Sequence, residues 1–286
     1  MKKISLLTMM LAFVVSAQAQ IKFGVHVAPF ISLMGSDYKQ VENVAVNGGA
    51  TVGVELEYYF SDGENYALTF GVDFSFNKGG SLLYKYGGTL MPLSDLDRNV
   101  FENAAATASP ADGVGIDMAA FTKINYSVHY AEIPIGLKLR TNELGGSYMR
   151  AFFHLPIVKI GVPVSASAKI FTPDAATEDY VNDSEGFRIE ANESPSKEPN
   201  VWKDITPIQV SVGLGMGVEY SPNADGGLRL YAGIYYDAGL LDMTNGFTSK
   251  QVRLREPGMA LGSTGEVNKN PTNMLHTIAL RIGVNF

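Results

Sequence analysis

Three side chains that could take part in catalysis alternate along one predicted strand. Asn125, Ser127 and His129 are two residues apart, so a strand places them on one face, which we expect to be the inner face of a barrel. A serine near a histidine suggests nucleophilic catalysis, here by a lipid-modifying hydrolase. Residues i and i+2 lie roughly 6.5 Å apart along a strand, however, and the sequence fixes no acidic partner. We therefore expect Ser127 and His129 to be polar filling, with the hydrolase as an alternative.

Two other groups of residues could bind a metal ion. His26, His129 and His154 could all point inward, but no two of them have the spacing of a metal-binding pair. The second group is acidic and lies in one predicted loop: Glu178, Asp179, Asp183 and Glu185. It lacks the spacing of oxygen ligands in a calcium-binding loop, so we expect a solvated acidic loop. The sequence predicts neither a metal site nor a cofactor.

Charged side chains of both signs fall on the face that we expect to point inward. They are Lys22, Glu55, Glu57, Asp73, Glu132, Lys138, Glu219, Arg229, Asp237 and Arg281. The interior of an eight-stranded barrel is just wide enough for side chains, and an unpaired charge there is costly. We therefore expect these charges to pair and fill the lumen. Such filling argues against an open pore, and a narrow pore remains the third alternative.

The strands that would position these groups show a period of two. The pattern is clearest over residues 273–286, where Ile278, Leu280 and Ile282 alternate with small or polar residues and an arginine. An apolar face toward lipid would explain the first set of residues, and a small or polar face toward a narrow lumen would explain the second. Similar alternation predicts eight strands, at residues 21–33, 50–60, 66–78, 124–140, 148–170, 206–220, 228–240 and 273–286.

The predicted connections alternate in length along the chain. Short turns are expected at residues 61–65, 141–147 and 221–227, and long loops at residues 34–49, 79–123, 171–205 and 241–272. An antiparallel up-and-down transmembrane barrel has this arrangement, with short periplasmic turns and long extracellular loops. A soluble β-sandwich is the alternative, but it has no reason to sort its loops by length onto opposite ends. We therefore predict an all-β, eight-stranded transmembrane barrel.

Three irregularities complicate the strand pattern. Apolar residues change from even to odd positions within 124–140, which predicts a bulge near Ala131–Glu132. A second change of phase is predicted near Ile157–Val158. The stretches 82–86 and 89–93 flank Gly87-Gly88 and predict a small hairpin, which would raise the strand count to ten if it joined the wall.

The N-terminus and the composition indicate where the protein resides. Lys2 and Lys3, an apolar run and Ala17-Gln18-Ala19 predict a signal peptide over residues 1–19, followed by one barrel domain over residues 20–286. No cysteine is present, so no disulfide supports the fold. The formal charge of −7 becomes −9 without the two lysines, which gives no electrostatic reason to bind nucleic acid.

One segment resembles a known family. The residues Tyr130-Ala-Glu-Ile-Pro-Ile-Gly-Leu-Lys-Leu139 are similar to a Leu-Glu-Ile-Pro-Leu-Leu-Leu-Lys segment of the small outer-membrane β-barrel family related to PorT. The eight-strand plan more loosely resembles the OmpA and OmpX barrels. The resemblance implies an outer-membrane location and a role in protein export or envelope assembly. It also implies that the insertion machinery reads the terminal strand ending in Phe286.

Together these features predict a non-enzymatic protein of the outer membrane. Outer-membrane lipids would surround its barrel. Its long extracellular loops would contact a surface ligand or a protein partner, such as a component of a secretion complex.

Overall fold

The computed structural model describes residues 21–60, 64–90, 120–171, 180–183, 186–189, 196–198, 201–222, 227–244, 252–254 and 271–286. The predicted signal peptide lies outside these residues, as do Glu178, Asp179 and Glu185 of the predicted acidic loop. In the described part of the chain, no helix is both long and apolar enough to span a bilayer.

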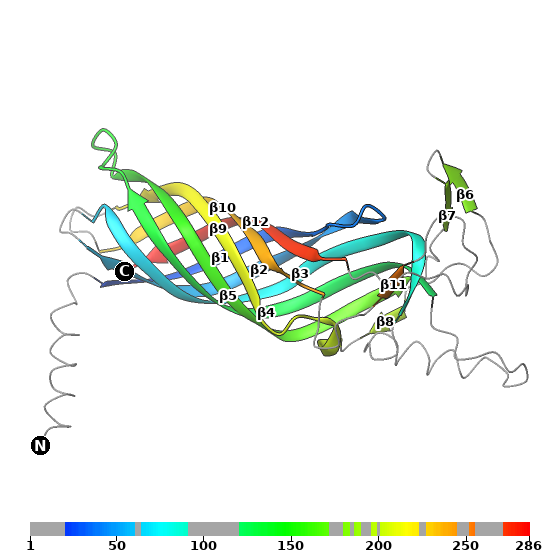
Figure 1. The fold of residues 1–286 in the computed structure, drawn as a ribbon. Helices are drawn as coiled ribbons and strands as arrows, with labels where there is room; N and C mark the ends of the chain where they lie inside the picture. The colour runs from blue at the N-terminus through cyan, green and yellow to red at the C-terminus, as the bar shows by residue number, and fades with distance from the viewer. Residues whose placement is uncertain are drawn as a thin grey trace, which may run out of the picture.

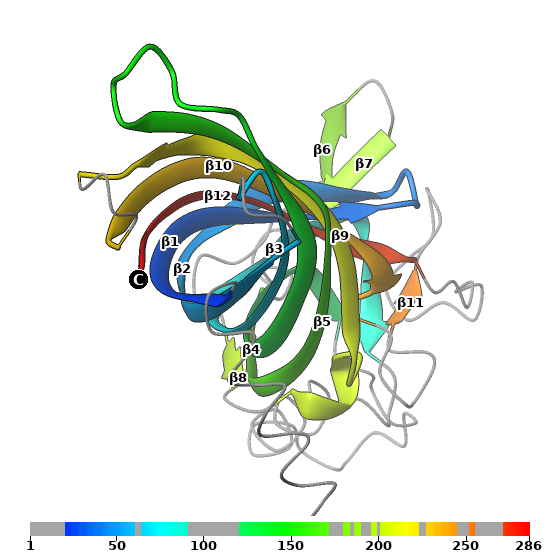
Figure 2. The same ribbon diagram turned by 90° about the vertical axis from the view of Figure 1, so that its left-hand side faces the viewer.

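Eight long strands form the wall of the molecule (Figures 1 and 2). They are β1 (Ile21–Ser36), β2 (Val41–Tyr59), β3 (Tyr66–Leu90), β4 (Ala120–Arg140), β5 (Met149–Phe171), β9 (Gln209–Tyr220), β10 (Arg229–Asp242) and β12 (Asn273–Asn285). Each pairs antiparallel with the next wall strand along the chain. The shorter elements are β6 (Tyr180–Asp183), β7 (Gly186–Ile189), β8 (Ser196–Glu198), the 3-10 helix η3 (Trp202–Asp204) and β11 (Val252–Leu254).

Pairing between the first and last strands closes the barrel. Val25 lies opposite Val284, and the backbone N–H of Phe286 donates to the carbonyl of Phe23 at 2.7 Å. Closure leaves no free strand edge in the wall. The backbone N–H and C=O groups of such an edge would have no hydrogen-bond partners in a bilayer. The predicted eight-stranded antiparallel barrel is confirmed.

The alternation of side chains follows the predicted faces through most of the barrel. Large apolar residues such as Val27, Ile234 and Ile282 point outward and are exposed, whereas His26 and Arg281 point inward and are buried. A protein in water would not display such a continuous apolar belt. The belt is therefore the surface that faces lipid hydrocarbon.

The strands are longer at one end than the sequence pattern indicates. β1 continues to Ser36 and β2 begins at Val41, so the predicted loop over residues 34–49 is mostly strand. The predicted hairpin is also wrong, because β3 runs unbroken through Gly87-Gly88 to Leu90. Gly88 pairs with Phe121 of β4 and with Leu254 of β11, so the strand continues there, although Gly87 has a φ of 73° and the register with β4 shifts between Leu83 and Gly88. The strand count of the wall stays at eight.

The change of phase in β4 does not come from a bulge. Even-numbered side chains point inward along the whole strand: Ile124, Tyr126, Val128 and Tyr130 at one end, and Glu132 and Lys138 at the other. The bulge predicted near Ala131–Glu132 is therefore wrong. The strand keeps its geometry while its surroundings change. At one end its outer face meets lipid and its inner face a polar lumen, whereas at the other end its outer face meets water and its inner face an apolar core.

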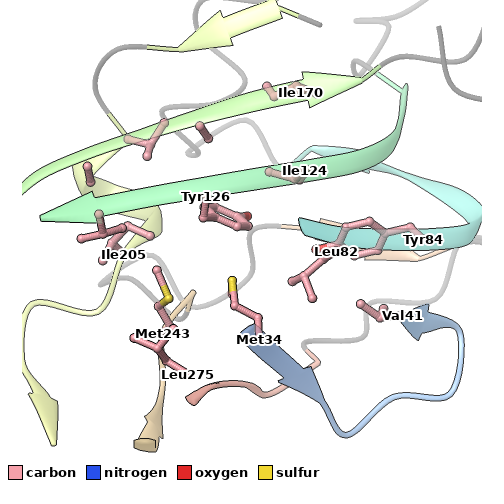
Figure 3. Packing of buried hydrophobic residues seen from close by; sticks show 14 of the residues in the cluster. Met34, Val41, Leu82, Tyr84, Ile124, Tyr126, Ile170, Ile205, Met243 and Leu275 are labelled. Atoms are coloured by element: carbon pink, nitrogen blue, oxygen red, sulfur yellow. The ribbon is translucent and has the colours of Figure 1, made fainter. Parts of the chain in front are cut away.

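That apolar core lies at the end of the barrel opposite the short turns. Its inner wall comes from β3, β4 and β5, which extend beyond the other strands (Figure 1). Figure 3 shows Leu82, Tyr126 and Ile170 facing Met34, Val41 and Leu275 and residues of the connecting segments such as Ile205 and Met243. We call this cluster the extracellular core, because the long connections mark this end as the outer one.

Bulges do occur, but on other residues. In β5, Leu155 and Pro156 both point outward, so this change of phase lies two residues before the predicted Ile157–Val158. A second outward pair, Val164 and Ser165, lies farther along β5. In β3, Phe76 and Asn77 together lie opposite the single residue His129 of β4.

Candidate functional site

The periplasmic half of the lumen holds a balanced group of four charges. Lys138 binds Glu57 at 2.6 Å and also contacts Glu219. Arg140 forms ion pairs with the same two carboxylates. Tyr59 donates a hydrogen bond to Glu57, and Lys138 is fully buried. Two cations and two anions with shared hydrogen bonds can be buried because each charge has partners on more than one side.

A second set of ion pairs fills the middle and outer half of the lumen. Arg281 contacts Glu55 at 3.2 Å and Asp73 at 3.6 Å, and His26 Nε2 lies 3.2 Å from the other oxygen of Asp73. Farther along the barrel, the pairs are Lys159 with Asp237 at 2.6 Å and Lys78 with Glu132 at 2.7 Å. These contacts confirm that the lumen charges are paired, although Lys159 and Lys78, the partners of Asp237 and Glu132, were not in the predicted set.

Glycine on the lumen face makes room for these large side chains. A Cβ atom on Gly53 would lie 2.0 Å from an oxygen of Asp73 and 2.7 Å from the ring of His26. A Cβ on Gly283 would lie 2.5 Å from the Tyr231 ring. The glycines that alternate with apolar residues in the sequence thus belong to the packing of the lumen.

Aromatic residues occupy the space between the charged groups. Phe152, Ile157, Tyr231 and Tyr235 form a buried cluster. The Lys138 ammonium lies 4.6 Å from the centre of the Phe152 ring. Charged side chains and these rings share the lumen, and the extracellular core lies beyond them, so buried side chains occupy the interior along the described part of the barrel.

Glu64 closes the periplasmic end of the lumen. Its carboxylate lies 3.0 Å from the Lys22 ammonium and 3.6 Å from Arg150, and it also binds Arg229. Burial favours the neutral acid, but the hydrogen bonds from Arg229 and Lys22 outweigh it, so the pKa of Glu64 lies below its ordinary value. Glu64 was not predicted as a functional residue, because the sequence of a turn does not indicate where its side chains point.

Ser127 and His129 lie on the outside of the barrel, not in the lumen. Both follow the odd-numbered face of β4, beside the bulge at Asn77. The Ser127 hydroxyl donates to Asn77 Oδ1 at 2.6 Å, and His129 Nδ1 accepts from the Asn77 backbone N–H at 3.2 Å. Each side chain thus binds Asn77, and no contact between the two is present. The prediction that Ser127 and His129 lie in the lumen is therefore wrong.

The three histidines that could have shared a metal ion are separated. His26 binds Asp73 and His154 binds Thr69 at 2.7 Å, both within the lumen, while His129 lies outside. In the part of the chain that the structure describes, no three histidine or acidic side chains are grouped as metal ligands would be. Of the predicted acidic loop, only Asp183 is described, at the end of β6.

The comparisons with known proteins concern the fold and the family. Among solved structures, Neisserial surface protein A has a TM-score of 0.34 at 11% identity, covering 92% of this chain and 95% of its own. Ail of Yersinia pestis has a TM-score of 0.32 at 9% identity, covering 93% and 99%. The outer membrane protease OmpT of Escherichia coli has a TM-score of 0.29 at 9% identity, covering 93% and 95%. None of the curated proteins matches this sequence.

The family is established by the sequence itself. Residues 16–245 match the family described as outer membrane protein beta-barrel domain, which is well over half of the chain. That match agrees with the closed eight-stranded barrel, the outward apolar belt and the polar lumen. The chain belongs to the outer membrane protein beta-barrel domain family and is a protein of the outer membrane.

Proposed function

We propose that this protein is a non-enzymatic outer-membrane barrel that holds its extracellular segments in place for contact with a protein partner or a surface ligand. One observation carries the proposal. β3, β4 and β5 continue past the lipid-facing belt and build the extracellular core, in which Val201, Met243 and Leu254 from the connecting segments are buried. The connections are therefore anchored to the barrel at defined points, as a binding surface requires.

A role in protein export or envelope assembly is the specific form that we propose. It rests on the PorT-like segment over residues 130–139. In this chain, Glu132 of that segment binds Lys78 and accepts from Ser75 at 2.6 Å, and Lys138 binds Glu57. The charged residues of the segment thus build the lumen, so the resemblance concerns the barrel interior. The partner itself would be recognised by the extracellular segments.

Crosslinking in living cells tests this proposal. A photo-crosslinking residue at Lys203, which is exposed beside the extracellular core, should capture a defined envelope or secretion protein that mass spectrometry identifies. The matched position is Leu144, exposed in the periplasmic turn at the other end of the barrel. Capture of the same proteins from both positions, or of none from Lys203, would contradict the proposal.

A narrow pore is the weaker alternative, because the lumen is filled. We expect purified protein in planar bilayers to show no steady conductance, since every layer from Glu64 to the extracellular core is occupied by side chains. Replacing Met243 by glycine, as a control, would open only the apolar end and should leave the bilayer silent. Reproducible channels in the unchanged protein would contradict this prediction.

A lipid-modifying hydrolase is disfavoured by the direction of one hydrogen bond. A serine nucleophile needs its base within hydrogen-bond reach, whereas the Ser127 hydroxyl donates to Asn77. We therefore expect Ser127→Ala to leave the acylation pattern of the outer-membrane lipids unchanged in a mass-spectrometric profile. A change that appears with both Ser127→Ala and His129→Ala would support the hydrolase instead.

A further inference from the structure

The outer face of β4 and β5 changes character where the apolar belt ends. Below the boundary, Ile133, Val162 and Val164 point outward and are exposed. Above it, the outward positions carry hydroxyl, amide, imidazole and ammonium groups. We call these residues the β4–β5 polar face: Lys123, Asn125, Ser127, His129, Ser165, Ser167 and Lys169.

The polar face is a continuous surface of paired residues. In the ladder between the two strands, His129 lies opposite Ser165, Ser127 opposite Ser167, and Asn125 opposite Lys169. Cross-strand neighbours have Cβ atoms roughly 5 Å apart, so their polar groups are close enough to contact one small headgroup together. His129 Nδ1 accepts a hydrogen bond, so its neutral ring carries the proton on Nε2 and is a donor there.

The tryptophan of η3 marks the level of this face relative to the membrane. Trp202 is 42% exposed, and the backbone N–H of its neighbour Val201 donates to the carbonyl of Ala166 in β5 at 3.1 Å. Tryptophan in outer-membrane barrels is enriched at the level of the lipid headgroups. Ser165 and Ser167 flank Ala166 in the sequence, so the polar face begins at the headgroup level.

The charge on the polar face is positive. Lys123 and Lys169 both belong to it, and the Lys123 ammonium lies 4.2 Å from the centre of the Phe171 ring. β5 contains no acidic residue, and the single one in β4, Glu132, points inward to Lys78. On β4 and β5 an anionic headgroup beside this face would therefore meet cations and no carboxylate. The short strand β8 pairs with β5 here, with Lys197 opposite Lys169 and Glu198 opposite Ala168.

We propose that the β4–β5 polar face binds a phosphorylated glycolipid of the outer leaflet. Lys123 and Lys169 attract its phosphate. The serine, asparagine and histidine groups hydrogen-bond its sugar hydroxyls, and Val162 and Val164 contact its acyl chains. This inference rests on the transmembrane barrel and does not depend on the proposed protein partner.

Trp202 provides the measurement, because it is the one tryptophan of the chain. Full-length protein in phosphatidylcholine nanodiscs would be titrated with diphosphoryl lipid A, or with phosphatidylglycerol in a parallel series, while the Trp202 emission is followed. We expect saturable binding of lipid A at least tenfold tighter than that of phosphatidylglycerol. Lys169→Glu should weaken lipid A binding at least about fivefold and Lys123→Glu with Lys169→Glu at least about 30-fold, because each lysine near an anionic surface contributes roughly 1 kcal/mol and the new carboxylate adds repulsion.

The matched control is Lys39→Glu, since Lys39 is exposed in the connection between β1 and β2, away from the polar face. It should leave the affinity within twofold of the unchanged protein. Heat-modifiability on gels shows that each variant is folded. Equal affinity for lipid A and phosphatidylglycerol would overturn the proposal, as would equal weakening by Lys39→Glu and Lys169→Glu. Native mass spectrometry of bound lipids gives a second readout that does not rely on fluorescence.

Discussion

Replacing Ile170 by arginine should unfold the extracellular core while the barrel below it stays inserted. Ile170 is buried against Ile124 and its neighbours (Figure 3), so the new charge would have no partner. Burying an unpaired charge costs at least about 3 kcal/mol. The membrane-spanning part has separate interactions in its lumen, so protein with a folded barrel should still reach the outer membrane. Surface proteolysis of intact cells should then cleave the variant faster than the unchanged protein.

The neighbouring residue is the control for this prediction. Lys169 already carries a positive charge one position earlier, on the outward side of the same strand, where water solvates it. Lys169→Ala should change the free energy of unfolding by less than about 0.5 kcal/mol, as exposed substitutions usually do. If Ile170→Arg and Lys169→Ala were equally resistant to protease, the apolar interior of the extracellular core would not contribute to its stability.

The same physical difference explains what the sequence could and could not predict. In the lipid-facing belt, alternate positions are apolar because they contact hydrocarbon. The inward and outward faces of β1, β9, β10 and β12 could therefore be predicted from the sequence. In β4, the apolar set moves from odd to even positions. A bulge and a change of solvent produce the same pattern along one strand, and sequence periodicity does not separate them. The extra residues in β3 and β5 show that bulges were a reasonable expectation, although not at Ala131–Glu132.

The bulge wrongly predicted in β4 also led to the wrong position for Ser127 and His129. With a bulge, Ser127 and His129 would share the lumen with Glu132; without one, they lie on the opposite face. The continuation of β3 to Leu90 was hidden for a related reason. Gly87-Gly88 is a turn signal by local propensity, but β4 and β11 both pair with Gly88, and β3 continues past it. Those partners are far away in the sequence.

The pairing of the lumen charges shows a further limit. Glu57 and Lys138 face inward as predicted, yet 81 positions separate them. Their contact depends on the stagger of the strands around the barrel, which no local pattern encodes. Lys159 was also missed, because the faces of the predicted strand over residues 148–170 were not assigned; a change of phase at Leu155–Pro156 or at Ile157–Val158 places it inward alike.

Replacing Ile282 by arginine should impair insertion into the membrane. Ile282 points outward within the apolar belt and is 50% exposed there, so the arginine would face lipid. Such a charge costs roughly 2–4 kcal/mol at the bilayer midplane and less toward the interfaces. β12 also closes the barrel by pairing with β1, with Ile282 opposite Val27. Slower insertion of β12 would therefore delay closure. The folded, heat-modifiable fraction in isolated outer membranes should fall, and Phe286 deletion should have a smaller effect in the same direction.

Arg281 provides the matched comparison, because it places the same charge one residue away on the inner face. Arg281→Lys keeps a cation near Glu55 and Asp73 and should insert normally. Arg281→Ala should also insert, since no charge faces lipid. It leaves Glu55 and Asp73 without their guanidinium, however, and breaking a buried pair costs about 3–5 kcal/mol. Its folded form should therefore unfold at lower urea concentration.

The two variants are thus expected to fail in different measurements. Ile282→Arg should reduce the amount inserted, whereas Arg281→Ala should reduce the stability of what has been inserted. Ile170→Arg, with a buried charge above the membrane, should reduce neither, because its damage is confined to the extracellular core. If Ile282→Arg inserted as efficiently as Arg281→Lys, the outward face of β12 would not be facing hydrocarbon. The membrane-spanning part of the barrel would then have to be placed elsewhere along the strands.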